Sequence, residues 1–274
     1  MRLLAPAVAL CCGVSALCAD DPPPGPQQQA AMLAAMARYA EHYQSSIPNF
    51  LCLEVTEQFT SGSKAKRWRR GDTLTSRLAF SEGQERRTLE LVNNKPIHWS
   101  VKLLRTPLTT QGQFGPALAA IFADSSHASF EWSHWDTLRG HRAAVFDYSI
   151  DKQHSQMKLS LSDIATAIVP YHGSIEADPD TGSVWRISFI ASNLPPELHQ
   201  KGIANTVDFE LVTIANSQYL LPVHATIVAT RQTELIRNEI QLSEYRKFTA
   251  ESSLKFDTAP ADNRPTSGAA QPQP

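Results

Sequence analysis

The chain has 274 residues, of which 25 are basic and 27 acidic, so its net charge is −2. A chain so close to neutrality lacks the strongly basic surface on which general nucleic-acid binding depends. Hydrophobic residues make up 42% of it, and we find no internal repeat. These properties favour one folded domain with peripheral segments.

Residues 1–19 are typical of an export signal peptide. Arg2 supplies a positive charge, and the apolar run from Leu3 to Leu17 is shorter than the ~20 residues that a membrane-spanning helix needs. Ala19 is a small residue at a plausible cleavage point. We therefore expect cleavage, followed by a periplasmic or secreted location.

A lipid anchor in the envelope is the alternative, because Cys11, Cys12 and Cys18 lie in this stretch. A lipid-modified cysteine normally follows a small residue, whereas Leu10 precedes Cys11 and Leu17 precedes Cys18. Release is therefore the favoured interpretation.

Cleavage would leave Cys52 as the only cysteine, so no intramolecular disulfide is expected. Leu51 and Leu53 flank it in an apolar segment. We interpret Cys52 as a small core residue and not as a reactive thiol.

Residues 20–28 form a proline-rich linker, and residues 28–43 are predicted to be a helix. In the helix, apolar side chains recur every three or four residues. Pro48 ends the pattern. Such a helix is expected to cover one face of a sheet.

From Asn49 onward the hydrophobic pattern alternates, as in half-buried antiparallel strands. A short helix from Gly115 to Phe122 interrupts it. The predicted strands are 50–59, 74–80, 87–92, 129–135, 143–150, 156–161, 171–176, 184–191, 206–214 and 219–230. The domain is expected to span 29–256, before a disordered polar tail at 257–274.

The segment from Asp178 to Ala191 is predicted to be a turn followed by a strand. Gly182 can adopt the positive φ that closes a hairpin. Strand alternation then turns Arg186 outward. The same alternation places three apolar side chains on the inner face: Trp185, Ile187 and Phe189.

Residues 234–248 allow two interpretations. Their composition favours a helix. However, Ile236, Ile240 and Leu242 share the parity of one strand face, and the preceding strands need a closing neighbour. We predict a strand, with a helix as the alternative.

Several of these motifs resemble the periplasmic lipoprotein-carrier superfamily (the LolA, LolB and LppX type) and the amino-terminal domain of the sensor RseB. The likeness lies in the hairpin at 174–187, which has an acidic turn with Thr-Gly, and in Tyr219-Leu-Leu-Pro-Val. Arg237-Asn-Glu and Tyr245-Arg-Lys-Phe resemble a set of uncharacterised exported bacterial proteins. The resemblance covers about residues 30–256.

The resemblance implies a mainly β fold, in which a half-open antiparallel barrel wraps over the N-terminal helix and the short inserted helix. Its concave face would hold a lipid, an acylated protein or another amphiphile, without enzymatic chemistry or a cofactor. A sensing or protein-interaction module of the RseB type is the alternative, and a hydrolase is the least favoured. The candidate lining residues are Trp99, Phe114, Phe122, Trp185 and Phe189, each of which has ordinary core packing as its alternative.

A basic hairpin provides a candidate patch for anionic headgroups or an envelope protein. It comprises Lys64, Lys66, Arg67, Trp68, Arg69 and Arg70. Because five cations cannot be buried without five partners, we expect this patch on the cavity rim or at an exposed sheet corner. A solvated hairpin end is the alternative interpretation.

Catalytic and metal-binding motifs are weak. Ser61 and Lys64 match Ser-x-x-Lys, but they lie in a polar turn and not at a helix start. Asp178 and Asp180 are interpreted as turn carboxylates. Four residues close in sequence could converge on a metal, although ordinary surface positions are favoured: His127, His134, His141 and Asp136. We predict no catalytic residue and no metal.

Overall fold

The computed structural model describes residues 21–62, 67–97, 115–161, 165–231 and 233–248. The predicted signal peptide and the C-terminal tail lie outside these residues. The helices are α1 (Pro26–Ser46) and α2 (Pro116–Phe122), with 3-10 turns η2 (Asp124–Ser126) and η3 (Pro196–Leu198). The strands are β1 (Phe50–Gly62), β2 (Arg69–Ser81), β3 (Gln84–Val92), β4 (Lys95–Pro96), β5 (Ser129–Leu138), β6 (His141–Ile150), β7 (Lys158–Leu161), β8 (Ala165–Ile168), β9 (Tyr171–Ala177), β10 (Val184–Ser192), β11 (Gly202–Ile214), β12 (Ser217–Thr230) and β13 (Glu234–Lys247).

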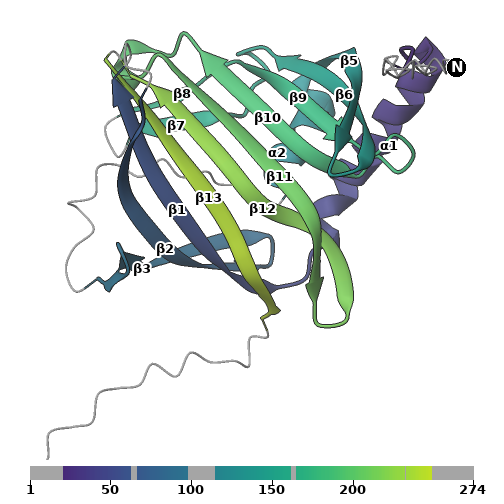
Figure 1. Ribbon diagram of the computed structural model, residues 1–274. Helices are drawn as coiled ribbons and strands as arrows, with labels where there is room; N and C mark the ends of the chain where they lie inside the picture. Colours follow the sequence, from purple (N-terminus) through teal and green to yellow (C-terminus); the bar gives the residue numbers. More distant parts are fainter. Residues whose placement is uncertain (1–20, 63–66, 98–114, 162–164, 232, 249–274) are drawn as a thin grey trace, which may run out of the picture.

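Eleven strands form one antiparallel sheet in the order β4-β3-β2-β1-β13-β12-β11-β10-β9-β6-β5. Its two edge strands, β4 and β5, do not pair with each other, so the curved sheet remains open (Figure 1). Strands β7 and β8 form a separate two-stranded sheet. The predicted fold, a half-open antiparallel barrel with two helices, is confirmed.

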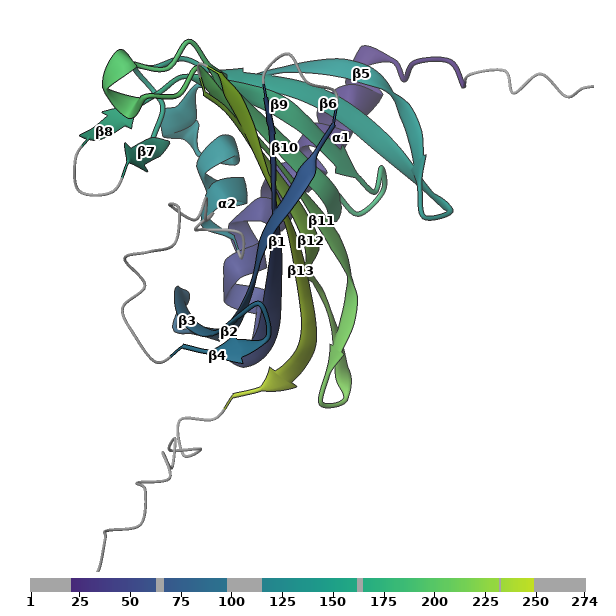
Figure 2. The same ribbon diagram turned by 60° about the vertical axis from the view of Figure 1, so that its left-hand side comes forward.

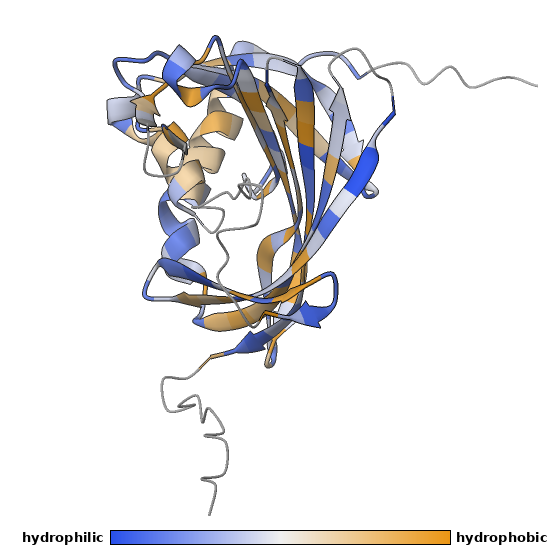
Figure 3. Cartoon of the chain, turned by 90° about the vertical axis from the view of Figure 1, so that its left-hand side faces the viewer, coloured by the Kyte–Doolittle hydropathy of each residue, from blue (hydrophilic) through white to orange (hydrophobic). Residues whose placement is uncertain are grey.

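Both helices lie on the concave side of the sheet, which we call the inner face (Figure 2). Hydrophobic residues recur along the strands of the sheet (Figure 3). Helix α2 consists mainly of apolar residues and buries Leu118 and Ile121. Met36 of α1 and Phe50 of β1 are fully buried in the resulting core. Tyr43 of α1 also donates a hydrogen bond to the backbone oxygen of Leu220 at 2.8 Å. The convex side is called the outer face below.

Helix α1 is longer than predicted at both ends. It begins at Pro26, because proline fits the first turn, where its missing N–H would have no partner. It ends at Ser46, since Ile47 precedes Pro48 and is extended. The predicted linker is therefore shorter than residues 20–28.

The turn between β9 and β10 packs directly against α1. Gly182 has a φ of +74°, and a Cβ atom there would lie 2.3 Å from the carbonyl carbon of Ala35. Asp178 holds the turn by accepting hydrogen bonds from the backbone N–H groups of Asp180 and Thr181. The predicted role of Asp178 as a turn carboxylate agrees with this geometry.

The ambiguous C-terminal segment is a strand, as predicted. β13 pairs with β1 on one side and β12 on the other. Its side chains Asn238, Ile240 and Leu242 are buried on the inner face. Burial and two hydrogen-bonded neighbours outweigh a helix-favouring composition. The sequence prediction missed β4 and β8, which have only two and four residues.

Candidate functional site

A row of aromatic rings crosses the inner face from α2 to β10. Phe122 stacks on Phe130 of β5, with ring centroids 5.1 Å apart. From there the row continues through Tyr148 and Tyr171 to Phe189, at centroid distances of 6.4, 6.0 and 6.5 Å. Phe122, Phe130 and Phe189 are only partly buried. The row thus links α2, β5, β6, β9 and β10.

The structure brings together two of the five predicted lining residues. Phe122 and Phe189 lie at opposite ends of the aromatic row. Trp99 and Phe114 lie outside the described residues. Sequence reasoning missed Phe130, Tyr148 and Tyr171, although strand alternation could have found them, because each has inner-face parity.

Trp185 does not join the row. The pairing of β10 with β9 shifts between Val184 and Arg186, so an irregularity at Trp185 changes the alternation. Val184 is buried in the core instead. The half-buried indole of Trp185 stacks on His141, with ring centroids 4.8 Å apart. Ile187 and Phe189 do contact the core, as predicted.

The inner face also carries charged residues near β3. Arg87 donates from Nε to both carboxylate oxygens of Glu54, at 2.9 and 2.7 Å. Glu85 lies 3.6 Å from the same guanidinium. The Glu54 side chain is 5% exposed. The predicted concave wall is therefore apolar over β6–β10 but has a buried ion pair over β1–β3.

Two buried amides interrupt the apolar wall farther along the sheet. Asn205 of β11 and Asn238 of β13 flank Ile227 of β12 in the same register row. Asn205 is 4% exposed, and no residue in the described part of the chain donates a hydrogen bond to its Oδ1. A buried polar atom without a partner costs about 1–3 kcal/mol. The sequence prediction did not include either amide.

Cys52 is a core residue, as predicted. Its thiol is buried, and burial together with the negative charge of Glu54 raises its pKa to about 12. The nucleophilic thiolate is therefore not populated near neutral pH.

The described part of the basic hairpin lies at an exposed sheet corner, which agrees with one of the predicted locations. Arg67, Arg69 and Arg70 are exposed, whereas Lys64 and Lys66 lie outside the described residues. Trp68 packs on the guanidinium of Arg237, whose Cζ is 4.6 Å from the indole centroid. On its other side Arg237 lies 4.8 Å from the ring of Phe59. This stack fixes the base of the hairpin.

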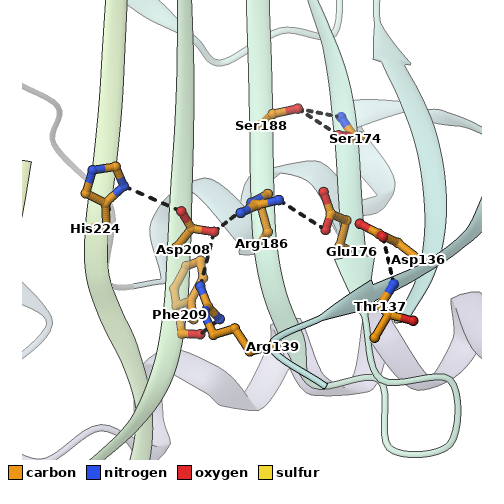
Figure 4. A network of polar contacts seen from close by, with 10 residues as sticks. All are labelled: Asp136, Thr137, Arg139, Ser174, Glu176, Arg186, Ser188, Asp208, Phe209 and His224. Carbon is orange, nitrogen blue, oxygen red and sulfur yellow. Dashed lines mark hydrogen bonds and ion pairs between the residues drawn. The ribbon is translucent and has the colours of Figure 1, made fainter. Parts of the chain in front are cut away.

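The outer face carries an ion network that sequence reasoning missed (Figure 4). Arg186 bridges Glu176 and Asp208, which occupy the paired positions on its two neighbouring strands. Arg139, from the β5–β6 turn, reaches Asp208 at 3.2 Å, and His224 lies 3.5 Å from it. The network therefore connects four strands and the end of the β5–β6 hairpin.

The two acids of the network are shifted in opposite directions. Burial raises the pKa of Glu176 despite the charge of Arg186. Burial also opposes ionisation of Asp208, but hydrogen bonds from His224 and Arg186 and the charges of Arg186 and Arg139 hold its pKa below the ordinary value. Asp208 is therefore the anionic centre of the network.

A pocket of about 560 Å³ lies between α1 and the β5–β6 hairpin. Arg142 packs over Trp135, with its Cζ 3.7 Å from the ring centroid, and pairs with Asp21 at 2.8 Å. The Trp135 indole donates to the backbone oxygen of Pro22 at 3.0 Å. The pocket walls are mixed in polarity and include Met32, Ala35, Arg38, Trp135, Arg142 and Asp180.

The described residues contain no group of three histidine, cysteine or acidic side chains that could hold a metal. His127 lies beside His154, with ring centroids 4.2 Å apart, whereas His141 stacks on Trp185. Ser61 lies at the end of β1. The Ser-x-x-Lys chemistry needs its serine at the start of a helix, and Ser61 does not have that position. No helix in the described part of the chain is long and apolar enough to cross a membrane.

No protein-family model and no curated protein matches the sequence. Several solved structures are similar in fold, and three of them are described here. An outer membrane lipoprotein-sorting protein domain from Vibrio parahaemolyticus is 11% identical, with 80% of this chain and 92% of that chain covered and a TM-score of 0.41. A DUF1329 family protein from Desulfovibrio piger is 10% identical, with coverages of 81% and 93% and a TM-score of 0.41.

The third is a LolA superfamily protein from Nitrosomonas europaea, which is 9% identical, with coverages of 79% and 94% and a TM-score of 0.31. Two of the three therefore carry descriptions from the group that the sequence motifs resemble. At this level of identity and superposition, the likeness says nothing about the ligand or activity of this chain.

Proposed function

We propose that the protein is an exported, non-enzymatic binding protein that holds a lipid, an acylated protein or another amphiphile against its inner face. The observation that carries this proposal is the aromatic row from Phe122 to Phe189. Its end residues point into the concave side yet keep exposed surface. Apolar and aromatic surface that the protein's own core does not cover is what an acyl chain binds.

Two further observations support binding without covalent chemistry. The single described thiol, Cys52, is buried and has a pKa of about 12. Two acids with shifted pKa values, Glu176 and Asp208, are paired with Arg186 on the outer face, away from the aromatic row. Export through the signal peptide at 1–19 would place such a protein in the periplasm or outside the cell.

The proposal is tested by displacement of a fluorescent fatty acid, together with native mass spectrometry of protein purified from an envelope fraction. Neighbouring residues of β10 provide a matched pair of variants. Phe189 is half-buried on the inner face, whereas Ile190 is 39% exposed on the outer face. Phe189→Ser should weaken fatty-acid binding about tenfold or more, since it removes most of a large apolar contact.

Ile190→Ser should leave the affinity unchanged, and both variants should be compared at temperatures well below their unfolding midpoints. Equal affinities for the two variants would contradict binding on the inner face. If no lipid co-purifies and no fatty acid displaces the fluorophore, the proposal fails, and the sensing or interaction alternative becomes the next to test.

A further inference from the structure

Asn205 occupies an unusual position within the apolar part of the inner wall. In the sheet register it pairs with Phe189 of β10 on one side and with Ile227 of β12 on the other. Ile203 and Val207, two residues away on β11, both contact the hydrophobic core. Asn205 shares their parity, so its amide points to the inner face.

The Oδ1 atom of Asn205 lacks the hydrogen bond that a buried polar atom normally makes. The residue is 4% exposed, its Oδ1 is fully buried, and no described residue donates to that oxygen. Most buried side-chain polar atoms in folded proteins have a partner, so each exception needs a specific explanation. The donor that this oxygen needs therefore comes from outside the described residues, as a ligand group or a water molecule.

The neighbours of Asn205 indicate where such a group would lie. Phe189 and Ile203 both point inward, and both are only partly buried. The surface that they expose therefore borders the concave side next to the amide. Phe189 is also the end of the aromatic row, so an acyl chain lying along the row would bring its polar end to Asn205.

We infer that Asn205 is a recognition residue for the polar end of the bound amphiphile, and that this end is a neutral hydrogen-bond donor such as an amide or a hydroxyl. The unpaired atom is the amide oxygen, which accepts hydrogen bonds, and an ionised carboxylate has no hydrogen to donate to it. A charged group would also be costly to bury here, because Phe189 and Ile227 offer no compensating charge. This inference rests on the proposed function and specifies its ligand.

The test compares dodecanamide, which can donate a hydrogen bond, with methyl dodecanoate, which has a similar shape and can only accept. Both compete against the same fluorescent fatty acid on the full chain. The wild-type protein should bind the amide about tenfold more tightly than the ester, the factor expected for one net hydrogen bond. Asn205→Leu should abolish this preference while retaining affinity for the ester.

Thr206→Val is the matched control, because Thr206 is the next residue of β11 and points to the opposite face. It should keep the preference for the amide. Asn205→Leu should also fold at least as stably as the wild type, since it removes a buried group without a partner. Equal binding of amide and ester by the wild type would overturn the inference alone, as would an unchanged preference in Asn205→Leu. Binding of neither compound would overturn the proposed function, and the inference with it.

Discussion

Arg186 of β10 donates from Nε to the Oδ1 atom of Asp208 on β11, across 2.6 Å and at directly paired positions of the sheet. The Asp208 side chain is 12% exposed, so solvent screens this pair weakly. Because Arg139 also reaches Asp208, the same carboxylate attaches the β5–β6 hairpin to the outer face. The network thus links β9, β10, β11, β12 and the β5–β6 turn on the side opposite the helices.

Arg186→Ala should lower the free energy of unfolding by about 1–3 kcal/mol, because it leaves two largely buried carboxylates without their shared partner. Arg77→Ala is the matched control. Arg77 also pairs with an acid on a neighbouring strand, Glu90, but their side chains are 32% and 37% exposed. Its loss should cost less than about 1 kcal/mol. Urea denaturation measures both values, and equal losses would contradict a special role for the network.

The stability of the network should depend on pH in two opposite ways. The folded state lowers the pKa of Asp208. Its stabilising contribution is therefore complete above the unfolded-state value of about 3.9 and is lost as the pH falls through the lower folded value. The folded state raises the pKa of Glu176. Its contribution is therefore present at low pH and is lost as the pH rises through the raised folded value.

Urea denaturation between pH 3 and pH 7 separates these two effects. As the pH falls through the acid range, Asp208→Asn should lose less stability than the wild type. On acidification from neutral pH, Glu176→Gln should lack the stabilisation that the wild type gains. Parallel curves for all three proteins would show that neither carboxyl titrates differently in the folded state.

The thiol of Cys52 should be inert in the folded protein. Its pKa is raised to about 12 by burial and by Glu54, so at pH 8 almost none of it is thiolate. The chain from Asp20 onward contains no other cysteine. A chromogenic disulfide reagent should therefore react fully only after denaturant is added, and Cys52→Ser gives the blank. Rapid reaction under native conditions would show an accessible thiol.

The positions of the two helices and of most strands along the chain could be predicted from the sequence, because the alternating pattern and the turn residues are local signals. β13 shows how far these signals reach. Its composition favours a helix, but the inner-face parity of Ile240 and Leu242 correctly indicated a strand. Where the alternation is locally broken, as at Trp185, the prediction for that side chain was wrong.

The polar features of the candidate site could not be predicted, because they depend on register between strands that are distant in sequence. Arg186 and Asp208 are 22 residues apart, and Arg87 and Glu54 are 33 apart. Alternation places each side chain on a face but does not say which residue lies opposite. The same holds for Asn205. The apolar residues that lie opposite it, Phe189 of β10 and Ile227 of β12, offer its Oδ1 no hydrogen-bond donor, and they are known only from the register.

The basic hairpin offers a test of membrane contact. Arg67 and Arg69 are exposed at the sheet corner. Arg67→Glu with Arg69→Glu should weaken binding to vesicles that contain anionic lipid, and any wild-type binding should fall as salt rises. Arg86→Glu with Arg246→Glu makes the same change in charge near the other end of β1, and should leave binding unchanged. Equal binding by both double variants would show that the charges of the hairpin do not contact the membrane, and that the hairpin is only a solvated end of the sheet.

Gly182 should be the glycine whose substitution most affects the contact between α1 and the sheet. Its φ is +74°, and an added Cβ would approach the carbonyl oxygen of Ala35 to 2.5 Å. Gly140, in the β5–β6 turn, has a similar φ of +83°, but nothing lies within 4 Å of the added atom. Gly140→Ala should therefore cost only the backbone strain of about 1–2 kcal/mol.

Gly182→Ala carries the same strain and must also displace the backbone of α1 or the turn itself. It should consequently lower the free energy of unfolding by clearly more than Gly140→Ala does. Hydrogen exchange should locate the difference in the first three turns of α1 and in the β9–β10 turn, because these are the two segments that meet at Ala35. Equal losses of stability, or exchange that increases elsewhere only, would contradict tight packing of α1 on this turn.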